Sequence, residues 1–98
     1  MLNSIYEFLN KAFCESSKAQ ETLKKAGLYS KELKYGYISK ENVNTLDEYS
    51  HIFNCSFKEL IGYYCLPIGE GEMILGLVAF NLKGEAIYTN DARTGVIN

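Results

Sequence analysis

The best candidate for catalytic chemistry is a histidine placed between an acid and a thiol at helical spacing. Asp47, His51 and Cys55 are four residues apart, so a continuous helix would put all three on one face. A thiol nucleophile needs a base within reach and a group that orients the base. Catalytic triads, however, gather residues from separate elements around a pocket that also stabilises an oxyanion. We therefore predict no catalytic residues and a protein that is not an enzyme.

The cysteines fit neither a metal site nor a disulfide framework. Cys14, Cys55 and Cys65 are separated by 41 and 10 positions, and the chain has one histidine. Zinc sites and disulfide scaffolds use other spacings. We expect free thiols that pack as small apolar residues in a reducing compartment. We expect neither a bound metal nor a cofactor.

The glycines near residue 70 lack the context of a nucleotide-binding loop. Gly69, Gly71 and Gly76 are followed by an apolar strand, whereas the dinucleotide fingerprint opens a helix and the P-loop continues into Gly-Lys-Ser/Thr. Glu70 and Glu72 would also repel a phosphate. The segment is predicted to be an acidic hairpin loop.

Tyrosine is abundant, with eight residues against five phenylalanines and no tryptophan. Tyrosine is enriched at protein interfaces because its ring is apolar and its hydroxyl can stay hydrated. The alternative is that the tyrosines border the core. We take Tyr63 and Tyr64, with Leu75 and Leu77 of the neighbouring apolar run, as candidate protein-interface residues.

Positive charge is concentrated in one segment. Residues 18–40 carry six lysines and two glutamates, a balance of +4, whereas residues 41–98 carry three basic and eight acidic residues, a balance of −5. Such asymmetry suits a face that meets an acidic partner, or lysines on solvent-exposed helix faces. Only one of the ten basic residues is arginine, which disfavours bidentate recognition of phosphate or guanine.

The first part of the chain is predicted to be helical. Apolar residues recur at helical spacing from Ile5 to Phe13, and Gly27 and Gly62 suit the left-handed position that ends helices. Capping boxes mark four starts, at Ser4, Ser17, Thr45 and Ser56. The predicted helices span residues 4–15, 17–26, 43–54 and 57–61. For residues 28–39 the sequence allows either a short helix or an extended segment.

The last part is predicted to be a three-stranded antiparallel β-meander of residues 63–68, 73–82 and 85–90. Lys83-Gly84 supplies the last hairpin turn, and Pro67 implies an edge strand or a strand end. Residues 73–80 are apolar without alternation, so both faces of this strand should be covered. Helices of the same chain, a second copy or a partner protein could cover them. The predicted class is α+β.

Length and composition predict one domain, residues 1–98, with its own core, since 47% of the residues are hydrophobic. The longest apolar run, Met73 to Phe80, is far shorter than the roughly 20 residues of a membrane-spanning helix. No basic region followed by an apolar stretch marks a signal peptide near Met1. We expect a small soluble cytoplasmic protein without a membrane partner.

Residues 20–28 (QETLKKAGL) are similar to the first of two paired DNA-binding helices with its turn, and residues 42–61 are similar to two helices that follow such a pair. From Gln20 to Ile61 the chain thus resembles the helix-turn-helix domain of Cro- and repressor-type regulators, the XRE family. The resemblance implies a recognition helix at residues 30–37, with Lys31, Lys34 and Tyr35 touching DNA. It does not extend to the meander.

Three functional interpretations remain open. The favoured one is a small non-enzymatic intracellular binding or regulatory protein that contacts another protein, or itself in a homodimer. Its size and its Lys-, Asn-, Ile- and Tyr-rich composition suit an inhibitor encoded by a phage or mobile element. The second interpretation is a DNA-binding helix-turn-helix regulator, with nucleic acid as the partner. The third is a small-ligand-binding protein or an enzyme.

Overall fold

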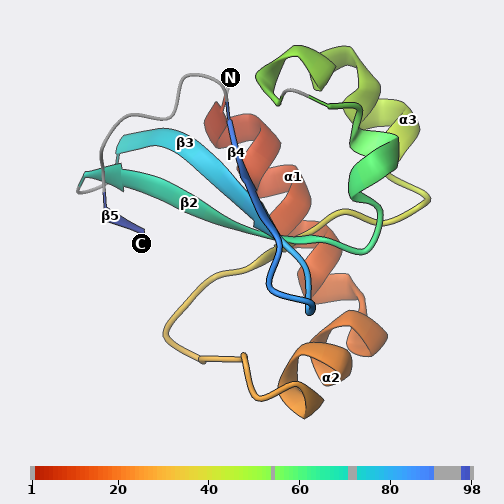
Figure 1. The fold of residues 1–98 in the computed structure, drawn as a ribbon, viewed down its shortest axis with the longest axis vertical. Helices are drawn as coiled ribbons and strands as arrows, with labels where there is room; N and C mark the ends of the chain where they lie inside the picture. Colours follow the sequence, from red (N-terminus) through yellow and green to blue (C-terminus); the bar gives the residue numbers. More distant parts are fainter. Residues whose placement is uncertain (1, 54, 71–72, 90–95, 98) are drawn as a thin grey trace.

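The computed structural model describes residues 2–53, 55–70, 73–89 and 96–97. The fold is α+β, with helices in the N-terminal part and an antiparallel sheet built mainly from the C-terminal part (Figure 1). The helices are α1 (Leu2–Glu15), α2 (Ser17–Lys25), α3 (Val43–Leu46) and the 3-10 helices η1 (Asp47–Ile52) and η2 (Phe57–Leu60). The strands are β1 (Gly36–Tyr37), β2 (Tyr64–Glu70), β3 (Met73–Phe80), β4 (Ala86–Tyr88) and β5 (Val96–Ile97).

The predicted break between the first two helices is confirmed. Ser16, one residue before the predicted cap at Ser17, caps α2 through its hydroxyl, which accepts a hydrogen bond from the Ala19 N–H (3.1 Å). At the other end of α2, Gly27 has φ 75° and its N–H donates to Lys24 O (3.0 Å). This left-handed glycine is the C-terminal cap that the sequence predicts.

The predicted helix over residues 43–54 is confirmed in part, because it ends at residue 52 and is mostly a 3-10 helix. One turn of α-helix, α3, continues directly into the tighter η1. Asp, Tyr, Ser and His in residues 47–51 are weak helix formers, which favours the end of the α-helix after one turn. Ile52 and Phe53, at the end of η1, are buried in the core. The next capping box is confirmed: Glu59 accepts a hydrogen bond from the Ser56 N–H (3.1 Å) at the start of η2.

The sheet has five strands where the sequence predicts three. Its order is β1-β2-β3-β4, and β5 also pairs with β2. The predicted meander is confirmed as β2, β3 and β4, while β1 and β5, two residues each, are too short for a periodic pattern to reveal. Residues 36–37 are therefore extended, which answers the question left open for residues 28–39.

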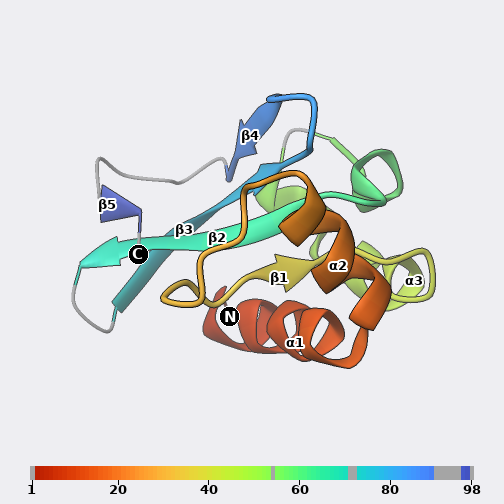
Figure 2. The ribbon, with the colours of Figure 1, turned by 90° about the horizontal axis from the view of Figure 1, so that it is seen from below.

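Gly36 permits an unusually close approach between β1 and α1, which lie side by side in Figure 2. A Cβ atom at Gly36 would lie 2.8 Å from the Cβ atom of Leu9, closer than two side chains tolerate. The same Cβ would lie 3.4 Å from that of Cys65 on β2. Glycine is thus required for β1 to fit between α1 and β2.

Pro67 lies in an interior strand, so the predicted edge strand or strand end is wrong. Opposite it, the N–H of Leu77 donates to Thr89 Oγ1 (3.2 Å) and the Thr89 N–H donates to Leu77 O (3.0 Å). Leu77 thus directs its backbone groups toward β4, and the missing N–H of Pro67 points to the opposite side of β2. There β1 pairs with residues 64–65 and β5 with residues 68–69. Proline occupies the interval between these two short strands.

Two apolar clusters lie on the two faces of the sheet. The first contains Leu77 and Ala79 of β3 together with residues of α1, α3, η1 and η2. The second contains Val78 of β3 together with Leu23 of α2 and Tyr35. Successive residues of β3 therefore enter different clusters, which explains why this strand does not alternate in polarity. No helix within the described ranges is long and apolar enough to cross a membrane.

Candidate functional site: an apolar groove beside the sheet

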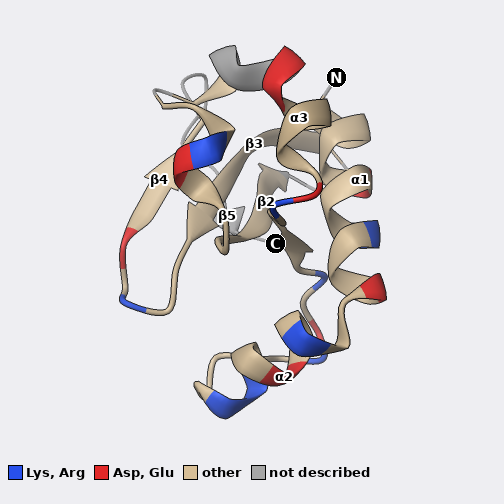
Figure 3. Ribbon diagram, turned by 90° about the vertical axis from the view of Figure 1, so that its right-hand side faces the viewer, with Lys and Arg blue, Asp and Glu red and all other residues tan. Residues whose placement is uncertain are grey.

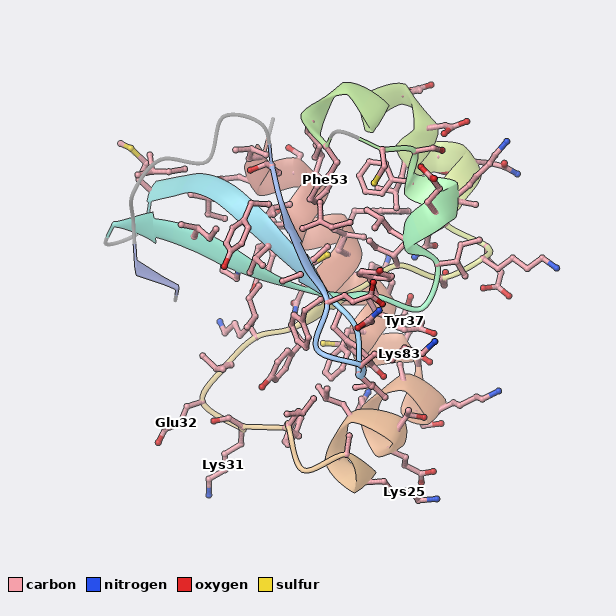
Figure 4. The ribbon with its side chains drawn as sticks, viewed as in Figure 1. Lys25, Lys31, Glu32, Tyr37, Phe53 and Lys83 are labelled. Atoms are coloured by element: carbon pink, nitrogen blue, oxygen red, sulfur yellow. The ribbon has the colours of Figure 1, made fainter. Side chains whose placement is uncertain are left out.

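An open groove lies on the sheet face that carries the second cluster. It separates the segment after α2 from the hairpin between β3 and β4, and its volume is about 530 Å³. Figure 4 shows this side of the molecule, with Lys83 marking the hairpin. We call it the apolar groove; its apolar lining consists of Leu28, Leu33, Tyr35, Leu66, Phe80 and Leu82.

One wall of the groove is a loop held by side-chain hydrogen bonds. The Tyr35 hydroxyl donates to Leu28 O (2.9 Å) and accepts from the Ser30 N–H (3.1 Å). From α1, the Tyr6 hydroxyl donates to Lys34 O (2.5 Å) and the Asn10 amide donates to Tyr35 O (2.8 Å). These bonds give residues 28–35 a fixed conformation without regular secondary structure.

The other wall is the hairpin from β3 to β4, where the predicted Lys83-Gly84 turn is confirmed. The Asn81 side-chain oxygen accepts from the N–H groups of Lys83 (3.0 Å) and Glu85 (3.0 Å). Gly84 has φ 92°, which glycine adopts without strain. Leu82 stands at the tip of this rigid turn and remains 40% exposed.

Aromatic rings form the floor of the groove. Phe80 lies between Tyr35, at a centroid distance of 6.3 Å, and Tyr64, at 5.9 Å. Phe13 of α1 packs against the Tyr35 ring, with a centroid distance of 5.6 Å. With Leu28 47% exposed at one rim, the groove presents an apolar surface to solvent.

One lysine lines the groove, and a second lies next to the segment that forms one wall. Lys83 lines the groove, and the Lys24 amine lies 5.0 Å from the centre of the Tyr29 ring beside Leu28. Lys25, Lys31 and Glu32 lie at the lower end of the molecule in Figure 4. Lys83 is the charged residue among the described residues that line the groove, so the lining itself favours an anionic group.

Two of the four predicted interface residues belong to the core. Tyr64 and Leu77 are almost completely buried, so neither can touch a partner, and their prediction is wrong. The Tyr64 hydroxyl donates to Ala19 O (2.7 Å), and burial, with a smaller effect of the neighbouring Tyr37, raises the pKa of the Tyr64 phenol. Tyr63 and Leu75 are half-buried and lie outside the groove.

The helix implied by the family resemblance is absent from residues 30–37. A turn at residues 31–33 leads into β1, whose place is fixed by pairing with β2 and by Gly36 against α1. Lys31 and Lys34 are exposed, but Tyr35 is buried in the second cluster. The three residues predicted to touch DNA therefore do not share one exposed helix face.

The structure does not assemble the triplet Asp47–His51–Cys55 on one helix. Asp47 opens η1, which has about three residues per turn, and Cys55 lies beyond its end. The side chain of His51 is outside the described part of the chain. Burial, with a smaller effect of the Glu59 charge, raises the pKa of the Cys55 thiol, which lowers its reactivity as a thiolate.

The other two thiols differ in environment. Cys14 is exposed on α1, whereas Cys65 is completely buried in the first cluster. Burial raises the pKa of the Cys65 thiol from 9.0 to about 12. Within the described residues, no three His, Cys, Asp or Glu side chains gather as metal ligands would.

The groove was not predicted from the sequence, although two signals pointed to it. Leu28 and Leu82 are large apolar residues placed in turns, beside Gly27 and next to Lys83-Gly84. Turns are usually polar, so leucines there indicate either a packed loop or a contact surface.

Comparison with other proteins gives one result. No family model, curated protein or solved structure matches the chain. A functional proposal therefore depends on the surface of this protein alone.

Proposed function

We propose that this chain is a small, non-enzymatic binding protein, and that the apolar groove is the surface with which it contacts another protein. The main support is the exposure of Leu28 and Leu82 on opposite rims of a groove with an aromatic floor. Exposed apolar surface costs solubility and is usually kept where a partner covers it. Aromatic residues in a rigid setting are also typical of the residues that dominate binding energy.

Charge indicates which kind of partner fits. Lys83 in the groove lining and Lys24 beside the Tyr29 ring would attract carboxylates that flank an apolar segment. The proposed occupant is therefore a stretch of a partner protein with large apolar residues between acidic ones. By occupying that stretch, the protein would regulate or inhibit its partner.

The test compares two substitutions at exposed leucines with one matched control. In the variant Leu28→Ser/Leu82→Ser, the groove loses apolar area while the core is unchanged. Met73 is 64% exposed at the start of β3 and does not line the groove, so Met73→Ser removes a similar apolar side chain elsewhere. The wild-type protein and the two variants are compared by two measurements. The first is the mass in solution, and the second is the set of proteins that each one captures by crosslinking in the cells that produce it.

We expect wild-type protein and Met73→Ser to retain the same partner, and the double variant to lose it. Binding should weaken as salt increases, because the lysines contribute to it. Equal capture of the partner by all three proteins would contradict the proposal that the apolar groove is the binding surface. A dimer that only the double variant fails to form would identify a second copy as the occupant. Salt-dependent binding to duplex DNA that requires Lys31 and Lys34 would instead support the DNA-binding interpretation.

A further inference from the structure

A second hollow lies away from the apolar groove and shares no lining residue with it. It is bounded by the C-terminal half of α1, the start of α2, the segment between β1 and α3, and Ile61, and its volume is about 560 Å³. This is within the range of pockets that hold small organic molecules. We refer to it as the polar recess.

Three lysines from three separate segments line the polar recess. Lys11 comes from α1, Lys18 from α2 and Lys40 from the segment after β1. Glu15 and Glu41 are also in the lining, which leaves a local balance of +1. Figure 3 shows how basic and acidic residues are interspersed along α1 and α2. The lysines favour an anion over a neutral ligand.

The start of α2 adds to this preference. Ser16 and Lys18, at the cap and in the first turn of this nine-residue helix, line the recess. The Ser16 hydroxyl satisfies the Ala19 N–H, but earlier N–H groups have no acceptor within a helix. Together with the peptide dipoles, these groups give the helix start a partial positive charge.

An independent observation comes from Asn42, which also lines the recess. Its side-chain nitrogen is buried and has no hydrogen-bond acceptor among the described residues. A buried donor without an acceptor is unfavourable, and in native proteins it often marks a place filled by a ligand or water. The nearby Ser39 hydroxyl already accepts from the Asn42 N–H (3.2 Å), so its own proton remains available for donation. An anionic oxygen in the recess would accept from the Ser39 hydroxyl, and it would accept from the Asn42 nitrogen once that side chain turns outward, because this nitrogen is closed off from solvent in the present conformation.

The remaining lining is mostly apolar and includes the ring of Tyr37 from β1. Phe8 and Ala12 of α1 face the recess, and Ile61 is 43% exposed there. We infer that the polar recess binds a small organic anion, in which a phosphate or carboxylate group is attached to an apolar or aromatic body. The lysines, the start of α2 and Asn42 would hold the anionic group, and Phe8 and Ile61 would contact the body.

Calorimetric titration with simple probes tests this inference. Phenyl phosphate and benzoate carry both parts of the proposed ligand, inorganic phosphate lacks the body, and benzyl alcohol lacks the charge. We expect saturable binding of phenyl phosphate or benzoate, about tenfold tighter than that of either incomplete probe. The tighter of the two complete probes identifies the anionic group as phosphate or carboxylate.

Variants locate the binding site. Lys18→Gln and Lys40→Gln should each weaken binding of the complete probe several-fold, whereas Lys31→Gln, an exposed lysine outside the recess, should not. Asn42→Ala should also weaken binding. Because the Asn42 side chain makes no capping hydrogen bond at α3, this variant should melt at or above the wild-type temperature.

Three results would overturn the inference. The first is that neither phenyl phosphate nor benzoate binds saturably. The second is that benzyl alcohol binds as tightly as these two probes. The third is that Lys18→Gln and Lys40→Gln leave the affinity for the probe unchanged. None of these results depends on the partner proposed for the apolar groove. Circular dichroism spectra of the variants distinguish lost binding from lost folding.

Discussion

Tyrosine hydroxyls hold together parts of this protein that are distant in sequence. Tyr64 on β2 donates to a carbonyl of α2, Tyr35 closes the loop after α2, and Tyr6 on α1 donates to Lys34 O. The abundance of tyrosine suggests an interface, but these three hydroxyls bond to backbone carbonyls of the same chain. Tyrosine suits this role because one residue supplies both buried apolar area and a directional donor.

Replacing Tyr64 by phenylalanine should lower the free energy of unfolding by about 1–2 kcal/mol, because a buried hydrogen bond to Ala19 O is lost. Urea denaturation measures the effect. Tyr88→Phe is the matched control, since the Tyr88 side chain is 52% exposed, and it should change stability by less than about 0.5 kcal/mol. If the two substitutions lowered the free energy of unfolding equally, the hydrogen bond from Tyr64 to Ala19 O would not contribute to stability.

The Cys65 thiol makes stability depend on alkaline pH. Its pKa is raised to about 12 in the folded protein, so the thiol loses its proton more readily once the chain unfolds. The contribution of the buried, protonated thiol to the free energy of unfolding is therefore complete below pH 9.0, and it is lost as the pH rises from 9.0 toward about 12. Over this range the urea midpoint should fall more steeply for wild-type protein than for Cys65→Ala. Parallel curves would show that the thiol does not ionise on unfolding.

Elements defined by local signals could be predicted from the sequence, and elements defined by distant contacts could not. The break before α2, the cap at Gly27 and the turn at Lys83-Gly84 depend on residues within one turn of each other. By contrast, β1 consists of two residues whose conformation depends on β2, almost thirty positions later. Residues 47–52 wind as a 3-10 helix, whereas the spacing of apolar residues predicts an α-helix there.

The substitution Gly36→Ala tests whether β1 and α1 pack too closely to admit a side chain at residue 36. The added Cβ would lie 2.8 Å from Leu9 Cβ, so β1 or α1 must move. We expect a loss of about 1–3 kcal/mol in the free energy of unfolding, which is typical of overpacked cores. Thermal and urea denaturation measure it, and an unchanged midpoint would mean that β1 is not confined in this way.

At the scale of the whole molecule, β2 and β3 separate two apolar clusters, and neither cluster could be assigned from the sequence. The apolar run of β3 predicted cover on both faces but not which elements supply it. The prediction of Tyr64 and Leu77 as interface residues is therefore wrong, and the exposed Leu28 and Leu82 are not among the predicted interface residues. Exposure depends on how distant segments pack, and one chain's residue pattern does not contain that information.

Because both clusters share β3, we expect them to unfold together. Leu9→Ala in the first cluster and Leu23→Ala in the second should each cost about 2–5 kcal/mol, since both side chains are fully buried. Unfolding followed by circular dichroism and by tyrosine fluorescence should show one coincident transition in either variant. Separate transitions would show that α2 and its cluster unfold independently.

The aromatic floor of the groove has a practical consequence. Tyr29, Tyr35, Phe80, Tyr64 and Tyr37 form a continuous series of neighbouring rings, with centroids 5.1 to 6.3 Å apart. Rings fixed at such distances in a chiral setting interact electronically and give a near-ultraviolet dichroic band, and without tryptophan no indole signal obscures it. A molecule seated against Tyr35 and Phe80 in the groove, or against Tyr37 in the polar recess, would change that band, so the band would report occupancy of either hollow.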